Sequence, residues 1–345
     1  MKRMNPWEVS AEEFPADGYA SDQLEFLLNY AILAPSRLNT QPWLFRIGVT
    51  DLAVYADRRR ALRVADPRDR ELTLSVGAVV FNLRVAAEYF GHAYRVELLP
   101  DPAEANLLAR FHLGLRADTG AEDVLLFHAI PQRHTNRQPF LPDPLPAELC
   151  TRLQNAAAQE GAWLACLREE PRRFEVADLI AQAHQVQWTD GRFRKELAAW
   201  VRNQQDFTDG VALRQLGLPD WVTFAGPIGL RALNLGKQKA ACDRELVLQS
   251  PTLAVLGTEA DTPLAWLQAG QALQRVLLTA RAENVWATIL NSPIQVPELR
   301  AALGTLTGHL GWPQVLLRLG YGPEVLPTPR RPPRQMLLIQ RHGHA

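Results

Sequence analysis

The sequence predicts an α+β fold made of two similar halves of one chain. Helical stripes of apolar residues are mixed with β-hairpins and single strands, without the regular alternation typical of β-α-β units. The order of elements within residues 20–115 also returns, weakly, within residues 147–320 of this 345-residue chain. We therefore expect two halves, residues 1–125 and 126–345, that form an intramolecular pseudo-dimer about a pseudo-two-fold axis.

The first half is expected to contain two helices and four strands. Apolar residues three and four apart predict its helices, and short apolar runs between turn residues predict its strands. Pro35 ends the first helix, and Gly91 is a plausible C-terminal cap for the second. In chain order we expect a helix over 22–34, a hairpin of 43–49 and 52–56, a helix over 71–91, and strands over 94–99 and 109–115.

The second half repeats this order around an additional block. The block, about residues 193–242, opens with a predicted helix over 193–202 and continues with closely spaced Gly and Pro. Irregular insertions of this kind often form lids, and a static surface excursion is an equal alternative. The other expected elements are helices over 147–160 and 266–283 and strands over 161–167, 252–257, 285–290 and 315–320.

The composition excludes several classes of protein. Lys plus Arg equals Asp plus Glu, at 37 each, so no general attraction to nucleic acid or to an anionic membrane is expected. No run of 18 apolar residues and no signal-peptide pattern occurs. The three cysteines are widely spaced without a CxxC pair, which supports neither a disulfide framework nor a zinc site. A reducing cytoplasm is the expected location.

The stretch Pro35-Ser36-Arg37-Leu38-Asn39-Thr40-Gln41-Pro42-Trp43 is the most informative motif. The two prolines restrict the backbone at both ends. Between them, a hydroxyl and an amide can bond the local backbone or face outward. An outward amide with exposed backbone groups matches the pyrimidine edge of a flavin, whereas the alternative is an ordinary helix-to-strand turn.

A second motif, Arg133-His134-Thr135-Asn136-Arg137-Gln138-Pro139-Phe140, is suited to a phosphate. The planar guanidinium forks of Arg133 and Arg137 can each bind phosphate oxygens through two bonds, and Thr135 adds a hydroxyl donor. The alternative is a solvated basic turn. Near the C-terminus, Arg330 or Arg331 on a proline-stiffened segment is a further candidate phosphate contact, with a simple basic connector as its alternative.

Other polar clusters carry less chemistry. Asp66 to Glu71 opens the long helix of the first half, where acids complement the helix dipole, so helix capping is expected there. The histidines lack metal-ligand spacing. HExxH, GxSxG, Walker A and a GxGxxG after a strand are all missing, which argues against a dinucleotide-binding fold of the usual type.

On these two motifs the chain resembles the nitroreductase family of FMN-dependent flavoproteins. The family's Pro-Ser-x-x-Asn-x-Gln-Pro-Trp turn and Arg-x-Ser/Thr-x-Arg-x-x-Phe segment are present, as is an Arg before proline at Arg331-Pro332. In ordinary members the arginine segment comes first in a shorter chain that pairs with a second copy. The reversed order and nearly doubled length are similar to the single-chain, two-half Acg-like branch, across roughly residues 20–340.

The resemblance implies a nitroreductase-like fold, an FMN cofactor and a set of binding residues. Pro35, Ser36, Arg37 and Asn39 are expected to line the flavin ring, and Arg133, Thr135, Arg137 and Arg330 or Arg331 to hold the phosphate. The second half has Glu160-Gly161-Ala162 in place of the turn, so one FMN per chain is expected.

The implied function is that of an NAD(P)H-dependent oxidoreductase acting on nitro- or quinone-type acceptors, with no side chain identified as a general acid. The alternative is an FMN storage or sequestration protein in which a lid covers the flavin. A monomer and a further homodimer both fit the sequence.

Overall fold

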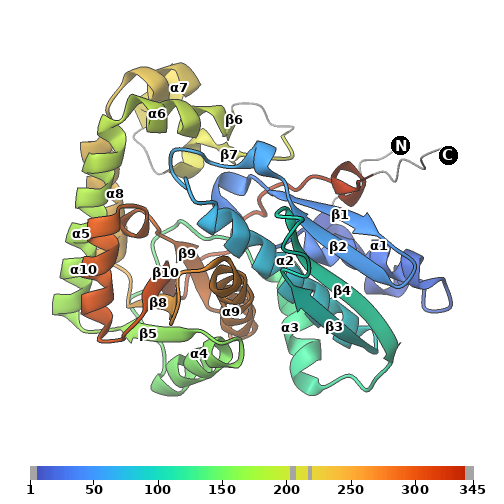
Figure 1. Cartoon of the computed structure of the whole chain (residues 1–345). Coiled ribbons are helices and arrows are strands. Elements are labelled where there is room, and N and C mark those ends of the chain that lie inside the picture. The colour runs from blue at the N-terminus through green and yellow to red at the C-terminus, as the bar shows by residue number, and fades with distance from the viewer. Residues whose placement is uncertain (1–5, 203–206, 217–219, 339–345) are drawn as a thin grey trace.

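Two four-stranded antiparallel sheets, one in each half of the chain, form the framework of the protein (Figure 1). The computed structural model describes residues 6–202, 207–216 and 220–338. The first sheet has the order β1-β2-β4-β3 and the second the order β5-β8-β10-β9. Their strands are β1 (Trp43–Ile47), β2 (Asp51–Ala56), β3 (His92–Leu98), β4 (Leu107–Arg116), β5 (Trp163–Leu167), β8 (Thr252–Thr258), β9 (Trp286–Ile289) and β10 (Trp312–Gly320).

The helices divide into those that pack on the sheets and those of the insertion. A long helix belongs to each sheet, α2 (Arg70–Tyr89) and α9 (Pro263–Ala282), and a shorter one precedes each first strand, α1 (Ala20–Ala31) and α4 (Ala147–Gln159). The remaining helices are α3 (Ala121–Gln132), α5 (Glu170–Thr189), α6 (Gly191–Ala199), α7 (Asp220–Ala232), α8 (Gly236–Leu248) and α10 (Pro297–Thr307).

The helices α2 and α9 pack directly against each other at two glycines. A Cβ on Gly77 would lie 2.2 Å from the carbonyl oxygen of Leu267, and one on Gly270 would lie 2.0 Å from that of Leu74. Only glycine permits so close an approach of two helix backbones. The contact is reciprocal, since each glycine meets the residue three positions before the other. One turn further on, Gln274 Nε2 donates to Asn82 Oδ1 at 2.7 Å.

Segments also cross between the halves. The helix α3, which contains the predicted boundary between residues 125 and 126, buries Leu126, Phe127 and Ile130 in the core of the first half. The C-terminal segment runs back to the first sheet, where Leu337 bridges Phe45 in parallel. As Figure 1 shows, this segment brings the C-terminus to the side of the molecule that holds the N-terminus.

The connection between the first two strands differs most between the halves. In the first sheet β1 and β2 form a tight hairpin, whereas residues 168–251 separate the neighbouring strands β5 and β8 of the second. This insertion contains α5 to α8 and the two-stranded parallel pair β6 (Val201–Arg202) and β7 (Val211–Ala212). It forms the upper left of the molecule in Figure 1.

The predicted strands and the principal helices of both halves are confirmed, with ends shifted by a few residues. Gly91 follows α2 with a φ of +73°, as a C-terminal glycine should. The helices α3, α5, α7, α8 and α10 were not predicted, and the block at 193–242 is more helical than expected. One of its breakers, Gly226 (φ 57°), is absorbed as a kink within α7, whereas residues 203–206 and 217–219 lie outside the described residues.

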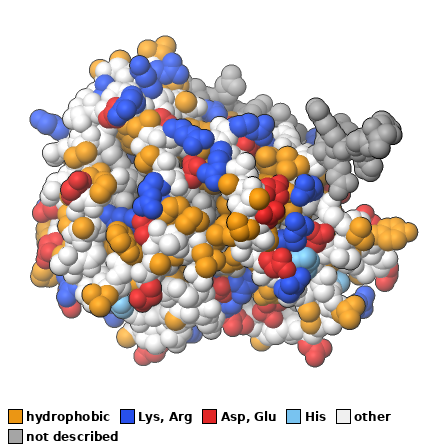
Figure 2. Space-filling view, in the orientation of Figure 1, with side chains coloured by type: hydrophobic (Ala, Val, Ile, Leu, Met, Phe, Trp, Pro, Cys, Tyr) orange, Lys and Arg blue, Asp and Glu red, His pale blue; other side chains and the backbone are white. Residues whose placement is uncertain are grey.

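The helix α2 alone, among the described residues, is long and apolar enough to cross a membrane. It is largely buried inside the protein, as a core helix must be. On the face seen in Figure 2, acidic and basic side chains are interspersed, in keeping with the equal numbers of the two charges.

Candidate functional site

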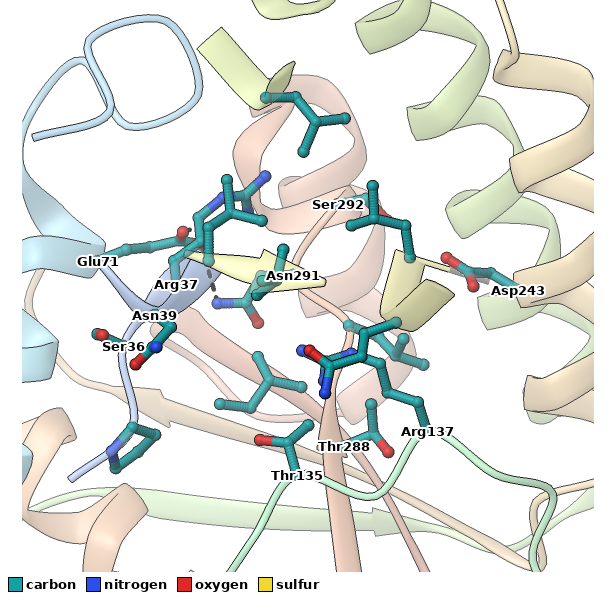
Figure 3. A pocket seen from close by; sticks show the side chains of 18 of the residues that line it. Ser36, Arg37, Asn39, Glu71, Thr135, Arg137, Asp243, Thr288, Asn291 and Ser292 are labelled. Carbon is teal, nitrogen blue, oxygen red and sulfur yellow. Dashed lines mark hydrogen bonds and ion pairs between the residues drawn. The ribbon is translucent and has the colours of Figure 1, made fainter. Parts of the chain in front are cut away.

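A cavity of about 250 Å³ lies where the first half, the second half and the insertion meet. We call residues 35–41 the binding turn. Its residues 35–39 form one wall of the cavity (Figure 3). Thr135, Arg137 and the loop 288–292 come from the second half. Side chains of α5, α6 and α8 contribute from the insertion. Segments roughly a hundred residues apart in sequence, which carry the two predicted motifs, therefore meet at one cavity.

The binding turn has an unusual backbone. Leu38, Asn39 and Gln41 all have positive φ values, between 49° and 53°, a conformation that costs energy for residues other than glycine. Local bonds help to hold it: the Gln41 amide donates to Ser36 Oγ at 2.9 Å. Pro35 and Pro42 restrict the flanking backbone. Ser36 accepts this bond, so its hydroxyl hydrogen is free to be donated toward the cavity.

The side chain of Asn39 is occupied by the C-terminal segment. Its Nδ2 donates to the carbonyl of Pro329 at 2.9 Å, and its Oδ1 accepts from Arg330 at 3.0 Å. Gln41 Oε1 similarly accepts from the backbone amide of Arg331 at 2.9 Å. The amide of Asn39 thus fixes the tail to the turn, and Asn39 faces the cavity as part of that assembly.

Arg137 is the cation best placed to meet a ligand. Its side chain extends from the loop after α3 into the cavity (Figure 3). Within the described part of the chain, its guanidinium forms no hydrogen bond and no ion pair. Arg137 is exposed to solvent in this cavity, and the nearby carboxylate of Asp243 acts to raise its pKa, which favours the charged guanidinium. Thr135, beside it, bridges Ala287 through its backbone and presents its side chain to the cavity.

Asp243 of α8 is a buried acid behind this end of the cavity. It accepts from His184 Nε2 at 2.7 Å and pairs with Lys239 one helical turn earlier. Burial alone would raise its pKa, but Lys239 and the His184 bond outweigh burial and hold the pKa at about 2. Burial also lowers the pKa of His184, which is therefore neutral near pH 7. Asp243 thus stays ionised and supplies negative charge near Arg137.

Arg133 and Arg330 bind backbone carbonyls of residues 32–34, directly after the C-terminal end of α1. Arg133 donates to the carbonyl of Leu33 at 3.1 Å, and Arg330 donates to the carbonyls of Ile32, Leu33 and Ala34. Cations stabilise the negative end of a helix dipole in this way. Burial lowers the pKa of Arg133 to about 10 and, with Arg133 nearby, lowers that of Arg330 further.

The nine predicted site residues divide into two groups by placement. The following line the cavity: Pro35, Ser36, Arg37, Asn39, Thr135, Arg137 and Arg330. Arg133 and Arg331 do not line the cavity. The guanidinium of Arg133 donates to the carbonyl of Leu33, and that of Arg331 donates to the carbonyl of Gln335 at 2.9 Å. Each of the two retains one buried nitrogen that has no hydrogen-bond partner among the described residues, Nε of Arg133 and NH1 of Arg331.

Glu71 is a cavity residue that the sequence did not identify. It was read as a helix-capping acid, but its carboxylate pairs with Arg37 at 3.3 Å and Arg70 at 3.1 Å and accepts from Asn291 and Gln295. Burial opposes its ionisation, yet the two arginines hold its pKa below the ordinary value. Glu71 therefore ties the binding turn to the second half across the cavity (Figure 3). The expected capping role belongs to Asp66, which accepts from the amides of Arg70 and Leu72.

Comparison with known proteins identifies the family. The model of the nitroreductase family matches residues 130–321. The Mycobacterium tuberculosis protein Rv3131, provisionally named an NAD(P)H nitroreductase, is 31% identical over 322 residues, which cover 90% of each chain. The chain belongs to the nitroreductase family.

Two further relatives extend the comparison. Acg of Mycobacterium tuberculosis, whose provisional name is also NAD(P)H nitroreductase, is 26% identical over 331 residues, or 94% of this chain and 98% of Acg. This full-length similarity agrees with the two-half branch that the sequence predicted. A solved nitroreductase with bound FMN from Bacteroides fragilis covers 64% of this chain at 13% identity and a TM-score of 0.38.

Within the described residues, no group of three or more His, Cys, Asp or Glu side chains is arranged to hold a metal ion. The cavity presents hydroxyls, arginines and apolar walls. The apolar walls include Leu74 and Leu273 of the paired helices and Phe193 and Leu197 of the insertion.

Proposed function

We propose that this protein binds one FMN in the cavity between its halves and acts as an NAD(P)H-dependent oxidoreductase on nitro- or quinone-type acceptors. The observation that carries the proposal is the meeting of the binding turn with Thr135 and Arg137 at one cavity. Two mycobacterial relatives are provisionally named NAD(P)H nitroreductases, which supports a nicotinamide electron donor.

The donor set fits a flavin mononucleotide. Arg137 offers a guanidinium without a protein partner within the described chain, which suits an anionic group such as the phosphate. Ser36 and Thr135 add hydroxyls at the same cavity. The apolar walls on α2 and α9 suit the face of a planar ring. Arg330 is positioned to add positive potential beside the binding turn, although its hydrogen bonds go to Asn39 and to the carbonyls that follow α1.

When bound, FMN supplies the hydride transfer, and the protein contributes binding, orientation and exclusion of water. Glu71 holds Arg37 at the wall and keeps its charge compensated. The carboxylate of Asp243 compensates the positive charge of Arg137. No side chain is assigned as a proton donor, and solvent is the proposed source of protons.

We also propose that the two halves act as a pseudo-dimer with a single site. The reciprocal contact of Gly77 and Gly270 is what a two-fold axis between α2 and α9 produces. Residues 32–42 connect α1 to β1, but only 160–162 connect α4 to β5, so the second half has no room for a binding turn. The free thiols of Cys150, Cys166 and Cys242 suit the proposed location in a reducing cytoplasm.

A second candidate function is storage or sequestration of FMN. Phe193, Leu197, Val211 and Leu216 of the insertion line the cavity, and this supports the idea of a cover over the ring. Such a cover would block the face on which a nicotinamide must stack.

One experiment distinguishes the two functions. Purified protein loaded with FMN is mixed anaerobically with NADH or NADPH, and the flavin absorbance is followed. Bleaching within the mixing time supports the oxidoreductase. Bleaching by dithionite alone supports sequestration. A flavin-to-protein ratio near one is expected, and a ratio near two, or no flavin bound at all, would overturn the single-site proposal.

A further inference from the structure

A short segment of the insertion is bonded to the back of the binding turn. Thr208 offers its carbonyl to Gln41 Nε2 at 2.8 Å, and the amide of Gly210 donates to the carbonyl of Asn39 at 3.3 Å. Between them, the carboxylate of Asp209 pairs with Arg60. Arg60 in turn donates through Nε to the carbonyl of Thr40. We call residues 208–210 the strap, because every residue of it is linked to the turn.

Asp209 also compensates two like charges that share one ring. It accepts from Arg202 at 2.8 Å as well as from Arg60. The guanidinium of Arg60 lies over Trp200 at 5.1 Å from the ring centroid, and that of Arg202 lies at 5.7 Å. Burial would raise the pKa of Asp209, but its bonds to Arg202 and Arg60 lower it. Without this carboxylate, the two cations at Trp200 would lose the acid that pairs with both of them.

The turn needs external support because of its backbone. Leu38, Asn39 and Gln41 persist in left-handed conformations only while their surroundings hold them there. On one side the support is the C-terminal segment, through Asn39 and Gln41. On the other side it is the strap. The strap contacts the turn through backbone carbonyls and Gln41, so its loss would alter the shape of the turn although no cavity-lining side chain is deleted.

We propose that Asp209 is a positioning residue for the cofactor: through Arg60 and the adjacent Gly210 it holds the binding turn in the shape that receives the flavin. The inference rests on the proposed function. It adds a residue that belongs to the insertion and does not line the cavity. It also gives the insertion a second role besides lining the cavity. The bonds between the strap and the binding turn and the binding of FMN then favour each other.

The test compares Asp209→Asn with Asp190→Asn. Asp190 forms an exposed pair with Arg192 at the start of α6 in the same insertion, and it has no bond to the turn. Two quantities are measured: hydrogen exchange of the apoprotein by mass spectrometry, and FMN dissociation from the holoprotein by flavin fluorescence. In Asp209→Asn we expect exchange of peptides covering 36–42 to rise at least threefold, exchange of α2 to stay unchanged, and FMN affinity to fall at least tenfold. Asp190→Asn should match the wild type in both.

A second variant reaches the same contact without changing charge. Gly210 has a φ of +76°, and a Cβ there would lie 2.4 Å from the carbonyl oxygen of Trp200, so Gly210→Ala should displace the strap and reproduce both effects. Asp209→Glu should restore much of the affinity. Unchanged exchange at 36–42, an unchanged affinity, or an equal rise in exchange along the whole chain would overturn the positioning role. A wild-type protein that binds no FMN would instead overturn the proposed function.

Discussion

Replacement of Arg137 by alanine should separate ligand binding from folding. The guanidinium of Arg137 makes no hydrogen bond to another described residue, so the folded apoprotein loses little when it is removed. A substitution free of such contacts changes stability by about 0.5 kcal/mol or less. Asp243 would lose one attractive neighbour, but it keeps Lys239 and His184.

The effect on the cofactor should be much larger. A hydrogen bond to a charged group contributes roughly 1.5–3 kcal/mol, which corresponds to a dissociation constant for FMN raised roughly 10- to 150-fold. Arg137→Lys should recover part of the loss, because it restores the charge without the planar fork. Arg192→Ala, which removes an exposed arginine of the insertion, is the matched control.

Arg133→Ala provides the contrasting case. Arg133 is buried and donates to the carbonyl of Leu33, which would keep only the longer bond from Arg330 after the substitution. Loss of this charged hydrogen bond should cost about 1–3 kcal/mol of apoprotein stability. The assays are urea unfolding of the apoprotein and fluorescence titration with FMN. The reasoning fails if Arg137→Ala destabilises the apoprotein as much as Arg133→Ala does, or if Arg137→Ala binds FMN with wild-type affinity.

Two further predictions concern the core and the acid behind Arg137. Gly270→Val should destabilise the protein by at least about 2 kcal/mol in urea unfolding, because its Cβ would meet the backbone of α2. The control is Gly304→Ala in α10, where the atom nearest to the added Cβ lies at 3.5 Å, and it should be neutral or stabilising. Equal effects of the two substitutions would contradict the packing argument. The pKa of Asp243 is lowered from 3.8 to about 2, so its ionisation stabilises the fold above pH 3.8 and this contribution disappears as pH falls to about 2. The stability lost in Asp243→Asn should therefore shrink by about 2 kcal/mol across that window, and a constant difference would refute the assignment.

Local sequence patterns predicted the sheets and the helices packed on them, because each strand or helix buries one recognisable apolar face. The insertion was harder to predict. Its helix α5 buries Val176, Ala177 and Ile180 on one side but also His184 and Gln187, which serve the cavity and blur the helical stripe. The Gly and Pro residues that suggested irregular structure are partly accommodated by the kink in α7.

The candidate site shows a similar division. Residue types and spacing identified the binding turn and the Thr135–Arg137 segment as candidate binding segments, and the fold places both at one cavity. What spacing does not contain is the partner of each guanidinium. Arg133, Arg137 and Arg330 are alike in sequence, yet Arg133 and Arg330 bond to the carbonyls that follow α1, and Arg137 is the one whose guanidinium makes no hydrogen bond to another described residue. Glu71 was missed for the same reason, since an acid that begins a helix gives no sign of the arginine across the cavity.

The differences between the halves fit the proposal of one FMN site in a repeated architecture. The first half keeps a long connection, 32–42, where the second has 160–162, and the second has a long connection, 168–251, where the first has a hairpin. Each half therefore supplies what the other lacks: the binding turn comes from one, and Arg137 and the insertion come from the other. Because α2 and α9 bury their glycine faces only against each other, neither half alone offers a complete core or a complete site. We therefore expect a fragment of residues 1–125 to expose the apolar face of α2 and to bind no flavin.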